Sequence, residues 1–212
     1  NPGFLRRING GLPWTRVKLA ASLDGRTAAA SGESKWITGP DARRDVQLWR
    51  AMSSAIITGI GTVLADDPAL TVRPDECEDW DHGEPVQPWR VVLDTDFRTP
   101  LTAKILKQPG RTIIVGIRSQ LPRQTALRDA GAEIWVLDGK SGKVDLKVLL
   151  QRLADEGANE VLIEAGATVA GSAARAGLVD EYVIYQAPVL MGSSAKPLLD
   201  WPQQFMREQR KL

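Results

Sequence analysis

The sequence contains a single cysteine, Cys77, and a single histidine, His82. One cysteine cannot form an internal disulfide, so nothing in the chain indicates an oxidising compartment. Both residues lie in one polar stretch, whereas a structural zinc site takes several cysteine and histidine ligands. Such a site is close to excluded, and we expect no bound metal.

Long apolar runs and a charge excess are also missing. No run of about 18 apolar residues could span a membrane, and residues 1–9 contain no apolar signal-peptide core. The 27 Lys+Arg and 26 Asp+Glu residues leave a net charge of +1, so no basic nucleic-acid-binding face is indicated. We expect a soluble, cytoplasmic protein with neither membrane nor nucleic-acid partners. Because the chain starts with Asn1 rather than Met, we expect a piece of a longer protein.

What the sequence does contain is an alternation of short apolar runs with helical patterns, over 212 residues that suit one domain. Runs bounded by Gly, Pro, Asp or Asn predict buried strands at 16–19, 55–57, 89–93, 112–117, 133–137, 160–163 and 181–185. Helical patterns cover 41–52, 124–130, 146–156 and 168–176, the third with a leucine stripe. The alternation predicts an α/β fold with helices on both faces of a sheet that is either parallel or mixed.

Two segments fall outside this alternation. Residues 75–88 are rich in carboxylates and lack aliphatic periodicity, which is typical of a solvated surface loop. We therefore assign no catalytic role to the cysteine and histidine inside it. Residues 203–212 are polar and basic, which is typical of a frayed terminal element.

Four glycine- or serine-rich junctions contain the candidate functional residues. In the first, residues 18–27, an apolar strand ends in small side chains and an Asp24-Gly25 turn. The small residues either let a flat ligand approach the backbone or belong to a plain hairpin. Lys18 is unusual in a strand that is otherwise buried, and it either extends to solvent or is held for function.

The second junction, residues 30–40, precedes the predicted helix at 41–52. Arg43 and Arg50 are on one face of that helix. Ser34 with Arg50 would suit a phosphate, because a guanidinium group binds phosphate with two hydrogen bonds. From the spacing alone, a solvated, charged helix face is the favoured explanation of the arginines.

The third and fourth junctions follow predicted strands. In the third, Gly59 and Gly61 could place a phosphate at a helix N-terminus, but the full dinucleotide fingerprint is missing. In the fourth, Glu164 ends a buried strand, where open α/β sheets bind ligands. The small residues from Gly166 onward either open a helix N-terminus for a pyrophosphate or allow a close strand–helix crossing.

Taken together, the junctions resemble a known family. KLAASLDGRTAAASGESKWITGPDARRDVQLWRA, GIGTVLADDPALTVR, VLIEAGATVAGS and YQAPVLMG are similar, in this order, to the reductase domain of bifunctional riboflavin biosynthesis proteins. The resemblance covers residues 1 to about 199, with long and specific motifs. It implies a single reductase domain over 1–212 with a dihydrofolate-reductase-like fold. The zinc deaminase that precedes this domain in bifunctional members has no counterpart here, since its His-x-Glu and Pro-Cys-x-x-Cys ligands are missing, and it is expected in cis in the full-length protein.

The resemblance implies the reduction of 5-amino-6-(5-phosphoribosylamino)uracil, a phosphorylated pyrimidine, by NADPH to the ribitylamino phosphate. It is compatible with a homodimer. Substrate-binding positions are matched by Ser34, Arg50, Leu70, Arg73 and Glu164. Cofactor-binding positions are matched by Ala20, Trp36, Thr62, Asp66, Thr95, Gly166, Ala167, Thr168, Val169, Ala170, Gly171 and Ser172. The catalytic candidates for proton delivery or iminium stabilisation are Lys18, Asp66 and Glu164, and the residues do not decide among them.

The sequence departs from the family at two places. Ala167 replaces the proline of the usual Glu-Ala-Gly-Pro-Thr turn, and the match ends after Leu199. A reductase of the same fold acting on dihydrofolate or another pterin is an alternative, as is a ligand-binding module that has lost catalysis. Arg118 and Ser119, directly after a predicted strand, could contact the 2′-phosphate of NADPH.

Overall fold

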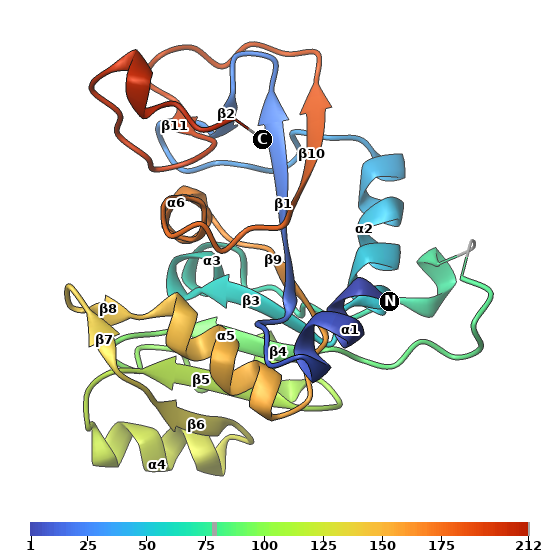
Figure 1. Ribbon diagram of the computed structural model, residues 1–212, viewed down its shortest axis with the longest axis vertical. Helices are drawn as coiled ribbons and strands as arrows, with labels where there is room; N and C mark the ends of the chain where they lie inside the picture. The colour runs from blue at the N-terminus through green and yellow to red at the C-terminus, as the bar shows by residue number, and fades with distance from the viewer. Residues whose placement is uncertain (78–79, 212) are drawn as a thin grey trace.

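The computed structural model describes residues 1–77 and 80–211 and contains a seven-stranded sheet in the order β10-β1-β9-β3-β4-β5-β6 (Figure 1). Its strands are β1 (Trp14–Ser22), β3 (Ala55–Gly59), β4 (Trp89–Leu93), β5 (Thr112–Gly116), β6 (Glu133–Val136), β9 (Glu160–Ile163) and β10 (Glu181–Ala187). Every neighbouring pair is parallel. The α/β prediction is confirmed, and of the two sheet types left open it is the parallel one that forms. All seven predicted strands are present.

In the part of the chain that the structure describes, antiparallel pairing is confined to two small ladders. One joins β2 (Arg26–Ala28) to β11 (Lys196–Pro197), and the other joins β7 (Gly139–Lys140) to β8 (Lys143–Val144). The hairpin interpretation of the Asp24-Gly25 turn is therefore wrong, since the strand after the turn pairs with β11 and not with β1.

The helices are α1 (Pro2–Ile8), α2 (Pro40–Met52), α3 (Ile60–Asp66), α4 (Leu121–Asp129), α5 (Leu146–Asp155) and α6 (Ala167–Arg175), with short 3-10 turns η1 (Pro74–Glu76), η2 (Lys104–Lys107) and η3 (Met206–Glu208). All four predicted helices are confirmed. The sequence patterns did not predict α1, and for α3 they indicated a helix N-terminus at Gly59 and Gly61 without a helical pattern after it. Both unpredicted helices have seven residues, too few to show a periodic pattern.

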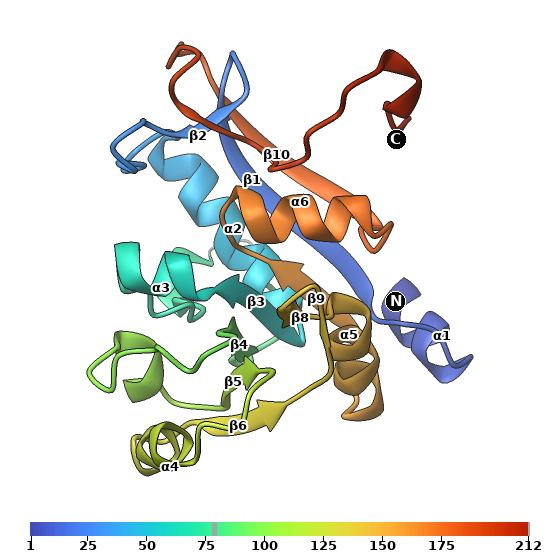
Figure 2. The same cartoon turned by 90° about the vertical axis from the view of Figure 1, so that its left-hand side faces the viewer.

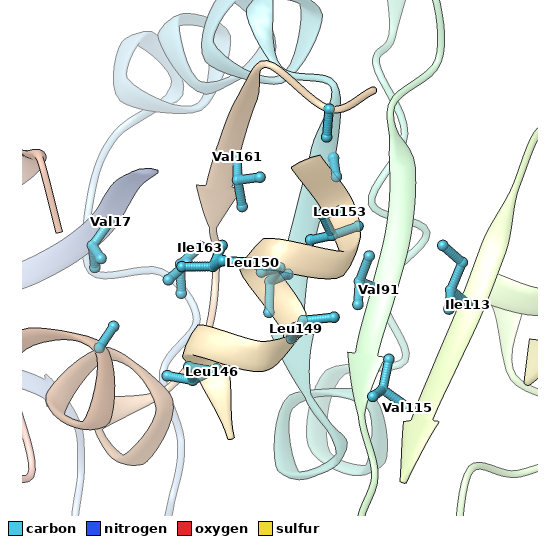
Figure 3. Close-up of a cluster of buried hydrophobic side chains, with 14 of the residues drawn as sticks. Val17, Val91, Ile113, Val115, Leu146, Leu149, Leu150, Leu153, Val161 and Ile163 are labelled. Carbon is cyan, nitrogen blue, oxygen red and sulfur yellow. The ribbon is translucent and has the colours of Figure 1, made fainter. Parts of the chain in front are cut away.

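The strands bury side chains on both faces of the sheet. Ile57 and Ile163 pack beneath α5 and α6, whereas their neighbours Ile56 and Leu162 pack on the side of α3 and α4. The predicted leucine stripe of α5 lies against the strands (Figure 3). This burial on both sides explains why the strands read as continuous apolar runs.

The carboxyl ends of β1 and β10 point toward the β2–β11 ladder, and α6 crosses the sheet below it (Figures 1 and 2). Residues 75–77 and 80–88 contain one 3-10 turn and otherwise no regular structure, as predicted, while residues 78 and 79 of that loop lie outside the described residues. Residues 203–211 are exposed and contain only η3. No helix in the described ranges is long and apolar enough to cross a membrane.

Candidate active site at the carboxyl end of the sheet

The strand order reverses at β9, which lies between β1 and β3 although it follows β6 in the chain. In open α/β sheets, ligands bind outside the carboxyl ends of the strands at such a switch point. Glu164 follows β9 directly, and its backbone N–H donates to the carbonyl of Ile57 at 2.9 Å. The topology therefore places Glu164 where the fold is expected to bind a ligand.

Arg50, in the last turn of α2, forms a two-pronged ion pair with Glu164. Its Nε and Nη2 atoms donate to Oε1 and Oε2 of Glu164 at 2.6 and 3.0 Å, and Nη1 donates to the carbonyl of Thr71 at 2.9 Å. The two side chains are only 15% and 10% exposed. The motifs assigned Arg50 and Glu164 to the substrate separately, whereas the structure shows that they bind each other. Each terminal nitrogen of Arg50 keeps an N–H group for a further acceptor.

The ion pair determines the protonation state of Glu164. Burial alone would raise the pKa of this carboxyl group, but the charge and hydrogen bonds of Arg50, together with the charge of Lys18, lower the pKa below its ordinary value. Glu164 is therefore a carboxylate at neutral pH. In this state it can accept hydrogen bonds and orient a ligand, but it has no proton to donate.

Lys18 reaches the same region from the middle of β1. Its Nζ atom lies 5.9 Å from the centroid of the Tyr185 ring, on β10. Ala20, two residues further along β1, shares its face of the sheet and pairs in register with Tyr185. The structure thus brings Lys18 close enough to Glu164 for its charge to lower the pKa of that carboxyl group.

Asp66, the third catalytic candidate, is on a different element, α3. It is the last residue of α3, and its Oδ1 atom is 3.8 Å from Nζ of Lys35. Thr62 shares its face of α3, one turn earlier. Within residues 1–77 and 80–211, no group of three or more His, Cys, Asp or Glu side chains could hold a metal ion.

The candidate phosphate-binding residues lie on segments that pack near Arg50. Arg73 is 53% exposed, and its Nη2 atom lies 2.8 Å from Oε2 of Glu76. Its backbone N–H donates to Oε1 of Gln47 on α2 at 3.1 Å, which ties the two segments together. Leu70 has a positive φ of 50° and a buried side chain, so it can offer a ligand only its backbone. Arg73 is therefore the more accessible of the two candidate arginines.

A small cavity of about 230 Å³ lies beside the first two junctions. Ser34 and Trp36 line it together with Val189 and Met191, from the segment after β10. The indole of Trp36 is 71% exposed, and the guanidinium group of Arg43 lies 4.5 Å from the ring centroid. Trp36 therefore has one supported face and room for a flat ligand.

The N-terminus of α6 fits a pyrophosphate. Gly166 caps this helix without any side-chain hydrogen bond, and the space beside its Cα is open. A Cβ atom on Gly59, which caps α3, would lie 3.1 Å from the Val169 side chain, so the N-termini of α3 and α6 are close neighbours. Thr95 follows β4 at the same edge of the sheet, and its carbonyl accepts from Ile117. Two glycine-capped helix ends without capping side chains suit an anionic cofactor.

The sequence reasoning missed the polar contacts that hold this site from β10 and α2. The hydroxyl of Tyr185 donates to Oδ2 of Asp45, and Nε1 of Trp49 donates to the same oxygen at 3.1 Å. Tyr185 and Asp45 lie 140 positions apart in the chain. In the sequence, the tyrosine of the YQAP segment indicates a polar group near the end of the strand, but nothing near it in the chain predicts that it bonds to Asp45.

Comparison with solved structures defines the class of the domain. The chain aligns with RibD from Acinetobacter baumannii (form 2) with a TM-score of 0.87 and 44% identity, over 100% of this chain and 56% of that one. A riboflavin biosynthesis reductase from Saccharomyces aligns with a TM-score of 0.67 and 22% identity, over 91% of this chain and 80% of that one, and supports the fold alone. The class is that of the dihydrofolate-reductase-like reductase domains.

Sequence comparison identifies the family. The model of the RibD C-terminal domain matches residues 13–209, so the expectation that the match ends after Leu199 is wrong. Riboflavin biosynthesis protein RibD from Escherichia coli K12 is 45% identical over 207 residues, and its Haemophilus influenzae counterpart is 44% identical over 208; each match covers 95% of this chain. The chain belongs to the RibD C-terminal domain family, so the resemblance is confirmed. It spans 55% and 54% of the lengths of these two relatives.

Proposed function

We propose that this chain reduces 5-amino-6-(5-phosphoribosylamino)uracil to 5-amino-6-(5-phosphoribitylamino)uracil with NADPH. Membership of the RibD C-terminal domain family supports this activity. The observation that carries the proposal is the buried Arg50–Glu164 pair at the β9 switch point, with Lys18 beside it. This arrangement offers a fixed carboxylate and a cation where a polar substrate would meet the sheet.

The reaction adds a hydride to C1 of the open-chain sugar and a proton to the attached nitrogen. NADPH supplies the hydride, so the protein contributes binding, orientation and charge. Glu164 is held as a carboxylate and would orient the substrate by accepting hydrogen bonds. We assign Lys18 as the acid that protonates the nitrogen. An ammonium group has protons to donate, and the charge of Lys18 is close enough to Glu164 to lower the pKa of that carboxyl group. Asp66, on α3, would contact the cofactor.

The phosphate of the substrate would bind Arg73 and Ser34, with the free N–H groups of Arg50 behind them. The Arg73–Glu76 pair is exposed, so a phosphate can displace the carboxylate at little cost. Leu70 would contribute backbone contacts. These arginines favour a sugar phosphate over dihydrofolate or another pterin, because those substrates carry no phosphate group for the arginines to bind.

The cofactor would extend from Trp36 and Ala20 across the N-termini of α3 and α6. Its pyrophosphate would bind the backbone from Gly166 to Ser172, and Thr62 on α3 and Thr95 after β4 would contact it from the neighbouring elements. Arg118 is exposed and pairs with Asp96 at 2.8 Å. An exposed pair of this kind is weak, so Arg118 can turn to a 2′-phosphate and favour NADPH over NADH.

The decisive measurement is the oxidation of NADPH at 340 nm with the phosphorylated substrate. Its dephosphorylated form, dihydrofolate and NADH serve as comparisons. We expect turnover with the phosphorylated uracil, little with the dephosphorylated form, none with dihydrofolate, and a higher kcat/KM for NADPH than for NADH. Turnover of dihydrofolate would favour the pterin alternative, and cofactor binding without any turnover would favour a lapsed binding module.

We further propose that the domain follows a deaminase domain in the full-length protein, that it forms a homodimer, and that it acts in the cytoplasm. Its relatives are nearly twice as long as this chain, which supports a second domain in cis. Light scattering of the purified chain tests the homodimer, and a mass of one chain would refute it.

A further inference from the structure

The ammonium group of Lys18 lies in the site beside the ring of Tyr185. Within the described part of the chain, Lys18 forms neither a salt bridge nor a hydrogen bond, although it lowers the pKa of Glu164. Its recorded contact is with the Tyr185 ring, whose centroid is 5.9 Å from Nζ. A lysine has a long, flexible side chain, so an unbonded ammonium group needs something to restrict where it points.

Tyr185 is itself held firmly. It is half-buried on β10, and its hydroxyl donates to Oδ2 of Asp45 on α2. The same carboxylate oxygen accepts from Nε1 of Trp49, one turn further along α2. Arg16 covers the Trp49 ring at 5.1 Å, which extends the contacts back to β1. The tyrosine ring is therefore fixed between a strand and a helix.

The phenol also stays neutral. Burial raises the pKa of Tyr185, and the neighbouring carboxylates of Asp45 and Glu164 raise it further. A neutral ring keeps its face attractive to a cation, whereas a phenolate would form a direct ion pair with the lysine. Burial, the Asp45 hydrogen bond and the neutral state of the phenol all favour a fixed Tyr185 ring with one face toward the Lys18 ammonium group.

We propose that Tyr185, anchored by Asp45, is a positioning residue that holds the Lys18 ammonium group beside Glu164. The inference rests on the proposed function for the role of Lys18, but the contact itself does not depend on catalysis. Tyr185 pairs in register with Ala20 on β1, two residues beyond Lys18, so its ring lies diagonally across from the lysine stem on the same face of the sheet.

The contact is tested by NMR of the whole chain with its lysines reductively methylated by ¹³C-formaldehyde. A methylated lysine keeps its charge, and methyl groups above an aromatic ring resonate upfield. Lys18→Arg assigns the Lys18 signal. We expect that signal to be shifted upfield in the unsubstituted protein, to move to the position of an exposed lysine in Tyr185→Leu, and to be largely retained in Tyr185→Phe.

The role in the reaction is tested by steady-state kinetics of the same variants. A cation–π contact at a partly exposed site is worth roughly a twofold to fivefold effect, so we expect Tyr185→Leu to lower kcat about that much with little change in KM. Tyr185→Phe should recover most of the loss. Tyr182→Phe is the matched control, because Tyr182 is on the same strand but packs against the opposite core, and it should change neither the Lys18 signal nor kcat.

Two results would overturn the inference. One is a Lys18 signal that is not shifted, or that is unchanged in Tyr185→Leu. The other is a loss of activity in which KM rises as much as kcat falls, or which Tyr185→Phe does not recover. An unsubstituted protein that turns over no uracil substrate would instead refute the proposed function, and the NMR result would still decide the contact.

Discussion

Replacing Arg50 by methionine should destabilise the fold in a pH-dependent way. The change removes the partner of a buried carboxylate and keeps most of the side-chain volume. Glu164 is 10% exposed and keeps only the charge of Lys18, which makes no hydrogen bond to it. Removing one partner of a buried pair typically costs about 3–5 kcal/mol, and we expect about 3 kcal/mol because Lys18 still favours the carboxylate. For a domain of this size, Tm should fall by about 6–12 °C.

The pH dependence follows from the direction of the pKa shift. In the unsubstituted protein the pKa of Glu164 is lowered, so its contribution to stability is present above the unfolded-state pKa and is lost as the pH falls through the folded-state pKa. In Arg50→Met, burial raises the pKa of Glu164, and the carboxyl group takes up a proton on mild acidification. The difference in unfolding free energy between the two proteins should therefore be largest near pH 7 and much smaller near pH 4.

The measurement is urea unfolding at both pH values, followed by tryptophan fluorescence, for Arg50→Met, Glu164→Gln and the double variant. The coupling energy of this cycle isolates the pair from other titrating groups. Arg44→Met is the matched control, because Arg44 pairs with Asp41 on the exposed side of the same helix and should change stability by less than about 0.5 kcal/mol. An equal loss at both pH values would refute the buried-pair reasoning.

Three further outcomes are expected. Glu164→Gln should fold, which circular dichroism checks. Its kcat should fall at least about tenfold, since the loss of a charge interaction worth one pKa unit is about a factor of ten. An unchanged kcat would mean that Glu164 is only structural. Arg73→Ala should raise KM for the phosphorylated substrate by roughly 10- to 150-fold, which is the value of one charge-assisted hydrogen bond. The KM for the dephosphorylated substrate and the Kd for NADPH should stay nearly unchanged. An equal rise in KM for both substrates would contradict a phosphate contact. Gly171→Ala should cost about 1–3 kcal/mol in thermal unfolding, because the new Cβ would lie 2.5 Å from the Asp200 carbonyl oxygen, and an unchanged Tm would show that this segment moves aside freely.

The structure changes how the phosphate site should be tested. The motifs place Arg50 and Arg73 at the same phosphate, so both would serve equally well as alanine variants. Arg50 is bound to Glu164 and Thr71, and its removal perturbs the carboxylate and the fold as well as any phosphate. Arg73 is half exposed, and within residues 1–77 and 80–211 its side chain pairs only with that of the nearby Glu76. Arg73 is therefore the cleaner probe of substrate binding.

Much of the fold can be predicted from the sequence, because its determinants are local. Strands buried on both faces are continuous apolar runs, as at β5, and a helix that packs by one face shows a leucine stripe, as at α5. The motifs also carry the family and its candidate residues. These features depend on the order of neighbouring residues, and a reader of the chain sees that order directly.

Only the tertiary structure decides which candidate residues meet. Lys18, Arg50, Glu164 and Tyr185 lie on different elements, and the insertion of β9 between β1 and β3 brings them to one edge of the sheet. The pairing of Arg50 with Glu164 joins residues 114 positions apart, and no local pattern specifies it. The sequence alone identifies the carboxyl group of Glu164. Its charge state depends on that distant arginine and on burial, so it is packing that keeps it a charged hydrogen-bond acceptor.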